Sequence, residues 1–221
     1  MNPIYVLLHK LDYCLQKELK NCQTVLDLGC GPSSPLKNIK HLKFSLGVEA
    51  FKPYLDISKK NKIHTKYLEE NILNVNFPDN SFDAVILIEV IEHLSKKDGQ
   101  KIIKKAFKWA KKKVILSTPN NYFQMGQVDQ NPYQQHRSGW SITELKNLGF
   151  KVNGVSGLKM FYQEENHIDS LITNKPYQNI KFKPKIFFYF INAFCQIFNY
   201  YYPRFSFGLF AVNEKHETNQ N

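Results

Sequence analysis

The sequence predicts an α/β fold in which a mostly parallel β-sheet carries helices on both faces. Short apolar runs rich in Val, Ile and Leu alternate along the chain with amphipathic segments of helical period. The runs are continuous rather than alternating, as expected for strands buried on both sides. The 221 residues, 43% of them hydrophobic, suit one domain with a sizeable core and exclude a disordered or fibrous chain.

Five elements are predicted over residues 3–60. Apolar residues at helical spacing indicate an amphipathic helix over 3–21. A buried strand at 24–28 follows and ends in a glycine turn, and a short helix is expected at 34–42. A second strand, 44–49, precedes a helix over 53–60, because Pro53 suits a first helical position.

The middle of the chain continues the alternation. A weak third strand is expected at 64–69 and a strong fourth strand at 82–88. A helix over 96–112 leads to a strand at 114–117. Residues 119–139 are rich in Asn, Gln, Pro and Gly and predict a long loop, a kind of segment that is usually functional in compact domains.

The last third predicts a helix at 141–148, a strand at 150–155 and a final strand that begins at residue 205. No internal repeat or interdomain linker interrupts the chain, so a single domain over 1–221 is expected. Its parts are an N-terminal helix (1–21), a ligand-binding core (22–157), an aromatic insertion (158–204) and the last strand (205–213).

The charge balance is strongly basic, with 30 Lys+Arg against 19 Asp+Glu and a formal net charge of +11. Only Arg137 and Arg204 are arginines, which indicates compositional drift rather than a phosphate-binding surface, so nucleic acid is a disfavoured partner. Nine lysines fall within 96–113. Five of them share one predicted helical face, which we interpret as solvated: Lys101, Lys104, Lys105, Lys108 and Lys112. The opposite face is apolar: Ile102, Ile103, Ala106, Phe107 and Ala110.

The four cysteines form no C-x-x-C pair and no zinc-ligand cluster. They are typical of reduced thiols in a cytoplasmic protein. The first residues carry no basic leader and no apolar run of signal-peptide length, so export is not expected.

A glycine turn and an acidic residue form the most informative pair. Asp27-Leu28-Gly29-Cys30-Gly31 ends the first strand and lets a ligand approach the backbone closely. Glu49 ends the second strand, where a carboxylate can accept hydrogen bonds from a ribose diol. Ser34 replaces the third glycine of a dinucleotide fingerprint, and Asp27 would repel a pyrophosphate. A carboxylate suits a ligand with an ammonium group instead.

Four motifs follow one another along the chain. They are Val25-Leu26-Asp27-Leu28-Gly29-Cys30-Gly31-Pro32-Ser33, Phe77-Pro78-Asp79-Asn80-Ser81-Phe82-Asp83-Ala84-Val85, Glu89-Val90-Ile91-Glu92-His93-Leu94 and Ser117-Thr118-Pro119-Asn120. Together, in this order and spacing, they resemble class I S-adenosylmethionine-dependent methyltransferases, in particular the methyltransferase type 11 or ubiquinone-biosynthesis-like group. The resemblance covers about residues 22–157 and implies a Rossmann-like fold with an antiparallel last strand.

The resemblance also implies the residues that bind S-adenosylmethionine. The methionine part would lie against the glycine turn and the end of the fourth strand, at Asp27, Gly29, Cys30, Gly31, Ile88 and Glu89. Glu49 would hold the ribose hydroxyls, and Asn71 with Ile72 would flank the adenine. Ser33 and Asn71 depart from the glycine and aspartate that the family often has there, but both retain hydrogen-bonding ability.

Methyl transfer from a sulfonium is an in-line displacement, so the enzyme positions its substrates and, for a hydroxyl acceptor, removes a proton. His93 and His136 are the candidate bases, although His93 could equally be a structural core histidine. We expect O-methylation of a small-molecule or a glycan- or lipid-linked acceptor. A protein that binds S-adenosylmethionine without catalysis is an alternative.

A metal-dependent reaction is a further alternative. Glu89-x-x-Glu92-His93, with His136 further on, could hold a divalent cation, because carboxylates and imidazoles suit Mg²⁺ or Mn²⁺. The pattern resembles metal-dependent RNA 2′-O-methyltransferases, which act on the 3′ end of small RNAs. The same Glu-His-Leu sequence is also common in metal-free relatives, so the first expectation is a site without metal.

Residues 186–202 are free of charge and rich in aromatic residues. Asn192, Gln196 and Asn199 form a polar stripe, so the segment predicts an amphipathic helix and not a membrane span. Packing on the domain's own core and an interaction surface are equally compatible with this pattern. Because lysines precede the segment and Arg204 follows it, residues 181–204 could contact the inner face of a membrane as a peripheral anchor. The oligomeric state is not predicted.

Overall fold

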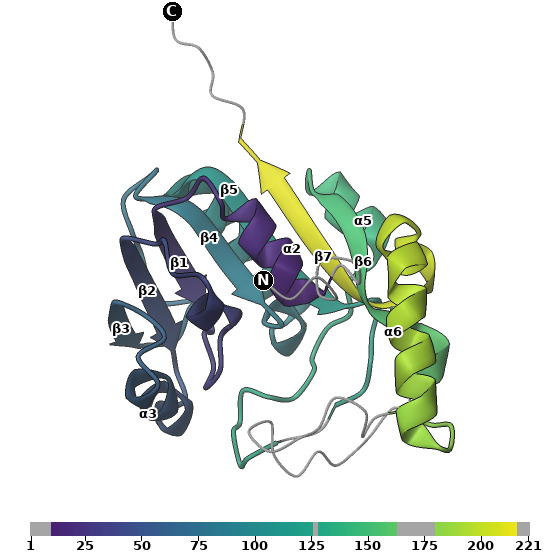
Figure 1. Ribbon diagram of the computed structural model, residues 1–221. Helices are drawn as coiled ribbons and strands as arrows, with labels where there is room; N and C mark the ends of the chain where they lie inside the picture. The colour runs from purple at the N-terminus through teal and green to yellow at the C-terminus, as the bar shows by residue number, and fades with distance from the viewer. Residues whose placement is uncertain (1–9, 126–127, 163–179, 216–221) are drawn as a thin grey trace, which may run out of the picture.

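The computed structural model describes residues 10–125, 128–162 and 180–215. Their centre is a seven-stranded sheet in the order β3-β2-β1-β4-β5-β7-β6 (Figure 1). Its strands are β1 (Thr24–Leu28), β2 (Phe44–Glu49), β3 (Lys66–Glu69), β4 (Phe82–Ile88), β5 (Ala110–Pro119), β6 (Lys151–Leu158) and β7 (Ser206–Glu214). The predicted strands are all present.

The directions of the strands confirm a mostly parallel sheet with an antiparallel last strand. β1 pairs in parallel with β2 and β4, while β3 and β5 extend the sheet in parallel on either side. β7 lies between β5 and β6 and is antiparallel to both, so β6 runs parallel to β5. The carboxyl ends of β1, β2, β4, β5 and β6 therefore meet at one edge of the sheet.

Side chains that alternate along each central strand fill two apolar layers, one on each face of the sheet. On β4, Val85 and Leu87 join the layer beneath α4 (Lys96–Trp109) and α5 (Ile142–Asn147). Ala84 and Ile86 join the opposite layer, which α2 (Leu11–Glu18) covers. Helices on both faces are thus confirmed.

Two helices near the N-terminus are shorter than predicted. Within the described residues, α2 begins at Leu11 and ends at Glu18, before the predicted end at 21, and residues 3–9 of the helix expected over 3–21 lie outside the described part. The helix expected over 34–42 is a 3-10 turn, η1 (Pro35–Asn38). Ser34 caps its start, but Ile39 is already extended, so the turn does not propagate. α3 (Lys52–Lys60) matches its prediction.

The helix predicted over 96–112 ends earlier, at Trp109, because sheet pairing takes over at Ala110, which is opposite Phe82. The assignment of Lys112 to the helical face is therefore wrong. Lys112 lies on β5, forms an ion pair with Asp83 at 3.1 Å and donates to the carbonyl of Asn21. Lys105 is half-buried and donates to the carbonyls of Leu73 and Val75, whereas the solvated face consists of Lys101, Lys104 and Lys108.

The aromatic segment forms one helix, α6 (Lys185–Tyr201), as the sequence predicts. α6 packs along β6 at the edge of the sheet (Figure 1). Its buried residues are Asn192, Gln196 and Asn199, so the polar stripe faces the protein. Among the described residues, no helix is long and apolar enough to cross a membrane.

Candidate active site

Two adjoining cavities lie at the carboxyl ends of β1, β2 and β4. The larger, about 380 Å³, is lined by the glycine turn and by side chains from the β4 and β5 ends. The smaller, about 140 Å³, shares Gly29, Glu49 and Glu89 with it and extends to Asn71 and Ile72. Every residue predicted to bind the cofactor lines one of the two: Asp27, Gly29, Cys30, Gly31, Glu49, Ile88 and Glu89 in the larger, Asn71 and Ile72 in the smaller.

The turn after β1 needs glycine for two separate reasons. Gly29 has a φ of 69° and Gly31 a φ of 57°, both in the left-handed region that disfavours other residues. In addition, a Cβ on Gly29 would lie 2.8 Å from Cγ2 of Val90, whereas the space around Gly31 is open. The amides of Gly29 and Cys30 both donate to the carbonyl of Val48, which fixes the turn to the end of β2.

Glu49 secures the glycine turn from the neighbouring strand. One carboxylate oxygen accepts a hydrogen bond from the Gly31 amide at 3.0 Å, and the other accepts one from the Phe51 amide at 2.8 Å. Burial raises the pKa of Glu49, while the bonds from Phe51 and Gly31 oppose that rise. Because each oxygen retains a second lone pair, Glu49 can still accept hydrogen bonds from a ribose diol.

Asp27 is buried beneath the turn, and the hydroxyl of Ser34 donates to its carboxylate at 2.6 Å. Burial raises the pKa of Asp27 to about 7, Glu49 adds to the rise, and the bond from Ser34 opposes it. Nε2 of His64 lies 3.5 Å from the same carboxylate. Burial lowers the pKa of His64 to about 4, so the pair is not an ion pair at neutral pH.

The raised pKa of Asp27 predicts that cofactor binding depends on pH. Only the ionised carboxylate attracts an ammonium group, so binding below pH 7 must release the proton of Asp27. We expect the affinity for S-adenosylhomocysteine to rise by up to about tenfold per pH unit from pH 5.5 towards 7, then level off. Calorimetry across this range tests it. Asp27→Asn should flatten the profile, and a wild-type profile that is already flat would contradict the prediction.

Two carboxylates stand at the end of β4. Glu89 has a φ of 54°, and its carboxylate accepts a hydrogen bond from the Ser117 hydroxyl at 2.6 Å. Glu92, on the 3-10 turn η2 (Ile91–His93), is 2% exposed, and neither of its carboxylate oxygens has a hydrogen-bond partner among the described residues. Burial raises the pKa of Glu92 well above its usual value, and the nearby Glu89 raises it further. Both carboxyl groups line the larger cavity, but only Glu89 has a side-chain partner in the described part of the chain.

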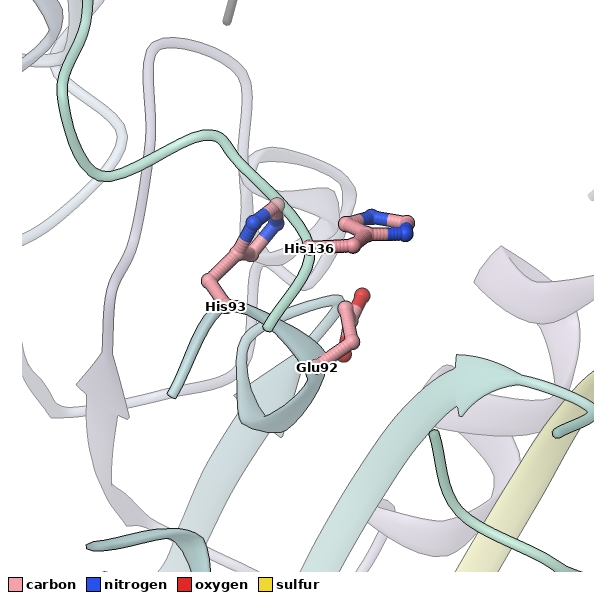
Figure 2. A group of neighbouring side chains, drawn as sticks. All are labelled: Glu92, His93 and His136. Atoms are coloured by element: carbon pink, nitrogen blue, oxygen red, sulfur yellow. The ribbon is translucent and has the colours of Figure 1, made fainter. Parts of the chain in front are cut away.

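The two candidate bases lie beside each other and above Glu92 (Figure 2). The rings of His93 and His136 are 4.8 Å apart between centroids and meet edge to face. One ligand atom from each of Glu92, His93 and His136 lies within 4.8 Å of the others. The structure therefore brings together three of the four residues of the predicted metal set. Glu89, the fourth, lies outside this group and is bound to Ser117.

His136 is held by the loop after β5. Its Nδ1 lies 2.6 Å from the carbonyl of Phe123, so Nδ1 carries the proton and Nε2 is the free basic nitrogen. Burial lowers the pKa of His136, and the hydrogen bond to the carbonyl of Phe123 offsets part of this decrease. Burial and the neighbouring His136 lower the pKa of His93 to about 4. Both imidazoles are therefore neutral at physiological pH.

The loop is anchored by residues that the sequence analysis did not single out. The amides of Arg137 and Ser138 donate to the carbonyl of Glu92, which joins the loop directly to η2. The indole of Trp140 is 1% exposed and donates to the carbonyl of Ile91 and to the Ser138 hydroxyl. In the sequence, the feature that points to this anchor is Trp140 itself, a single large aromatic residue at the end of a polar loop. The sequence offers no such signal for His64, and it does not reveal that Ser34 and Ser117 donate to Asp27 and Glu89.

Residues 26–118, which run from within β1 through β2, β3 and β4 to most of β5, match the family described as methyltransferase domain. This segment of the chain is similar to that family. The sheet order and the position of the cavity agree with the fold of class I methyltransferases. The methyl donor of this class is S-adenosylmethionine. A curated relative, an uncharacterized protein of Methanocaldococcus jannaschii, is 28% identical over 152 residues. The match covers 66% of this chain and 64% of the relative, so the chain spans less than two thirds of that relative's length.

Solved structures share the fold at low sequence identity. A SAM-dependent methyltransferase from Archaeoglobus fulgidus is 17% identical with a TM-score of 0.55, and the match covers 92% of this chain and 94% of that one. The plantazolicin methyltransferase BpumL, in complex with SAH, is 10% identical with a TM-score of 0.57, over 98% and 86%. The small RNA methyltransferase HEN1 is 16% identical with a TM-score of 0.55, over 95% of this chain and 26% of that one. At these identities the likeness shows the fold alone.

Proposed function

We propose that the protein transfers the methyl group of S-adenosylmethionine to a hydroxyl group of a small-molecule or a glycan- or lipid-linked acceptor, with His136 as the base. The observation that carries this proposal is the orientation of His136. Its Nδ1 proton is directed to Phe123, so the basic Nε2 is the nitrogen left for an acceptor in the cavity that His136 lines.

The protonation state of the histidines supports this role. A general base must be unprotonated before the reaction, and the lowered pKa of His136 keeps it neutral at physiological pH. His93 packs against it edge to face, and burial and the neighbouring His136 lower the pKa of His93 to about 4, so His93 is suited to position His136 rather than to take the proton itself. When bound, S-adenosylmethionine supplies the electrophilic methyl group.

The cavity wall next to the histidines indicates an acceptor that is partly apolar. Phe123, Met125 and Phe207 line the larger cavity together with Pro119. The rings of Phe123 and Phe207 meet edge to face at 4.9 Å, which makes a continuous apolar surface. A hydroxyl carried on an apolar ring or chain would fit between this wall and the imidazoles.

Replacing His136 by alanine tests the proposal. We expect transfer of a labelled methyl group to fall by at least about 100-fold, because proton removal is lost, while affinity for S-adenosylhomocysteine changes little. The assay uses radiolabelled S-adenosylmethionine with panels of soluble hydroxyl compounds and lipid extracts. His41→Ala, at an exposed histidine, is the matched control and should keep full activity.

Equal rates for the His136→Ala and His41→Ala proteins would exclude His136 as the base. Cofactor binding without transfer to any acceptor would favour the alternative of a non-catalytic S-adenosylmethionine-binding protein. A methylated product whose label is lost on mild alkaline treatment would indicate a carboxyl acceptor and contradict transfer to a hydroxyl.

A second candidate function, metal-dependent methylation of an RNA 2′-hydroxyl, is favoured by one observation. Glu92 is a buried carboxyl without a hydrogen-bond partner among the described residues, and Nδ1 of the adjacent His93 has none there either. Glu92, His93 and His136 each bring one ligand atom to within 4.8 Å of the others, and together they offer a set of oxygen and imidazole ligands that suits Mg²⁺ or Mn²⁺. In this function the cation would activate the hydroxyl, and the three side chains would hold it.

Manganese titration separates the two candidates. If the second is right, Mn²⁺ should bind with one-to-one stoichiometry, and Glu92→Gln should abolish binding while the exposed Glu144→Gln leaves it unchanged. Because the pKa of Glu92 is raised, binding releases a proton and the affinity should increase with pH. Absence of saturable Mn²⁺ binding in the wild-type protein would contradict the metal-dependent function and leave His136 as the base.

A further inference from the structure

Helix α6 is packed with its polar side inward and its apolar side outward. The three amide side chains of the helix, on Asn192, Gln196 and Asn199, are each at most 3% exposed. By contrast, Phe190 is 66% exposed and Phe194 is 72% exposed. Helices on the surface of a globular protein normally have the opposite arrangement. This inverted orientation therefore needs a structural cause, and the exposed aromatic side chains need an environment in which they are stable.

The cause is an irregularity in β6, where the register with β7 shifts between Val155 and Leu158. The amides of Gly157 and Leu158 are directed to α6, where the side-chain oxygens of Gln196 and Asn192 accept their hydrogen bonds. The Gln196 amide in turn donates to the carbonyl of Gly154 at 2.9 Å. Buried backbone amides and carbonyls must have hydrogen-bond partners. The hydrogen bonds of Gly154, Gly157 and Leu158 with α6 therefore hold the polar stripe of the helix inward.

Glycines in β6 allow this close approach. A Cβ on Gly157 would lie 2.4 Å from the side chain of Asn192, and a Cβ on Gly154 would lie 2.2 Å from the carbonyl oxygen of Asn199. The helix cannot rotate about its axis without breaking these bonds. Its aromatic side must consequently face away from the sheet.

The outward side of α6 and the following turn form one apolar strip, which we name the α6 face. Its members are each at least 49% exposed: Ile186, Phe187, Phe190, Phe194, Phe198, Tyr201, Tyr202 and Phe205. With about 150–250 Å² per aromatic side chain, the exposed area is on the order of 1,000 Å². The largest patch on a typical monomer is about 300–600 Å², so scattered exposure does not account for the α6 face.

Cationic residues border the α6 face at both of its ends. Lys181 and Lys183 are exposed just before the helix, and Arg204 is exposed just after it. No Asp or Glu occurs anywhere in residues 180–205. An apolar strip of aromatic residues flanked by cations matches the interface of an anionic lipid bilayer. Two copies of the chain joined through this face would bring like charges together at the ends, which disfavours a dimer.

The helix also begins at the edge of the sheet that carries the cavities. β6 runs parallel to β5, so Leu158 at its end lies at the same edge as Pro119 at the end of β5. Asn192, in the first half of α6, contacts Leu158. The lysine end of the α6 face is therefore on the side of the molecule where the cavities are found.

We propose that the α6 face docks in the plane of an anionic lipid bilayer, with α6 lying along the interface and its aromatic side chains among the acyl chains. Lys181, Lys183 and Arg204 contact the phosphate groups of the lipids. This inference goes beyond the proposed function, because it concerns where the protein binds and does not depend on the identity of the acceptor or on catalysis.

Vesicle co-sedimentation tests the proposal without any enzyme assay. The full chain should sediment with vesicles of phosphatidylcholine containing about one third phosphatidylglycerol, and much less with phosphatidylcholine alone. Binding should weaken as salt rises, because the lysines act through a screened potential. Absence of binding to anionic vesicles, with a monomeric protein, would overturn the proposal.

Matched variants identify the surface. Phe190→Ser with Phe194→Ser should lower the vesicle affinity at least tenfold, and the thermal midpoint should not fall, because both side chains are exposed. Lys181→Glu with Lys183→Glu should do the same. Lys104→Glu with Lys108→Glu makes an equal charge change on α4 and should lower the affinity less than half as much. Equal losses for the two lysine pairs would overturn the α6 face as the docking surface, and so would a stable dimer that Phe194→Ser dissociates.

Discussion

Alanine at position 29 is expected to destabilise the protein and to abolish cofactor binding. The left-handed conformation of Gly29 adds about 1–2 kcal/mol of strain for a residue with a Cβ. The contact at 2.8 Å with Val90 adds about 1–3 kcal/mol, because the β-branched side chain is buried and stiff about its χ1 torsion. Val90 adjoins Glu89, so the disturbance reaches the cavity as well as the turn.

Gly31→Ala is the matched control for this prediction. Gly31 has the same left-handed backbone, but beyond its two chain neighbours no atom of the described residues lies within 4 Å of the position of its Cβ, so only the strain is added. Thermal unfolding should show a drop of roughly 5–15 °C for Gly29→Ala and a clearly smaller one for Gly31→Ala. Equal decreases in the unfolding midpoint of the two variants would show that the contact with Val90 does not contribute to the loss of stability.

Trp140→Ala is expected to cost about 3–5 kcal/mol of unfolding free energy, the usual cost of truncating a buried Trp. The indole fills the space beside Gly99, where a Cβ would lie 2.5 Å from the ring, and Lys96 lies 4.0 Å from the ring centroid. Its loss leaves the carbonyl of Ile91 without the indole donor. The loop that carries His136 would lose its attachment to η2.

Trp109→Ala separates loop positioning from general destabilisation. Trp109 is 3% exposed in the same apolar layer, so its truncation should destabilise the protein by a similar amount. NMR titration of His136 gives the second measurement. In Trp140→Ala the pKa of His136 should rise towards its usual 6.5, because burial is what lowers it. In Trp109→Ala it should stay low; a low value in both variants would exclude Trp140 as the anchor.

Much of the fold follows from local pattern. β2 and β4 have the predicted bounds because each is an apolar run closed by a charged residue or a turn. The glycine turn with Glu49 also follows from the sequence, since the two lie at the ends of neighbouring parallel strands. Chain segments such as 110–113 were misassigned, because lysines at helical spacing do not reveal that a partner strand pairs with them.

Some features of the candidate site were predictable from the sequence, and others are visible only in the structure. Residue types identified Asp27, Glu49, His93 and His136, but their roles in catalysis and binding stay predictions. Only the structure shows that the rings of His93 and His136 are in contact, because 43 residues separate them and the carbonyl of Glu92 joins their segments. Only the structure shows that Glu92 is buried and has no hydrogen-bond partner in the described part of the chain.

By itself, the sequence determined the order of strands and helices, the glycine turn and the chemical types at the carboxyl edge of the sheet, because these depend on residues close together in the chain. The tertiary structure decided which nitrogen of His136 is basic, where Lys112 pairs and which side of α6 faces out. These depend on groups far apart in the sequence. The aromatic and polar residues of α6 define an amphipathic helix in either orientation, and the amides of Gly157 and Leu158 on β6 turn its polar side inward.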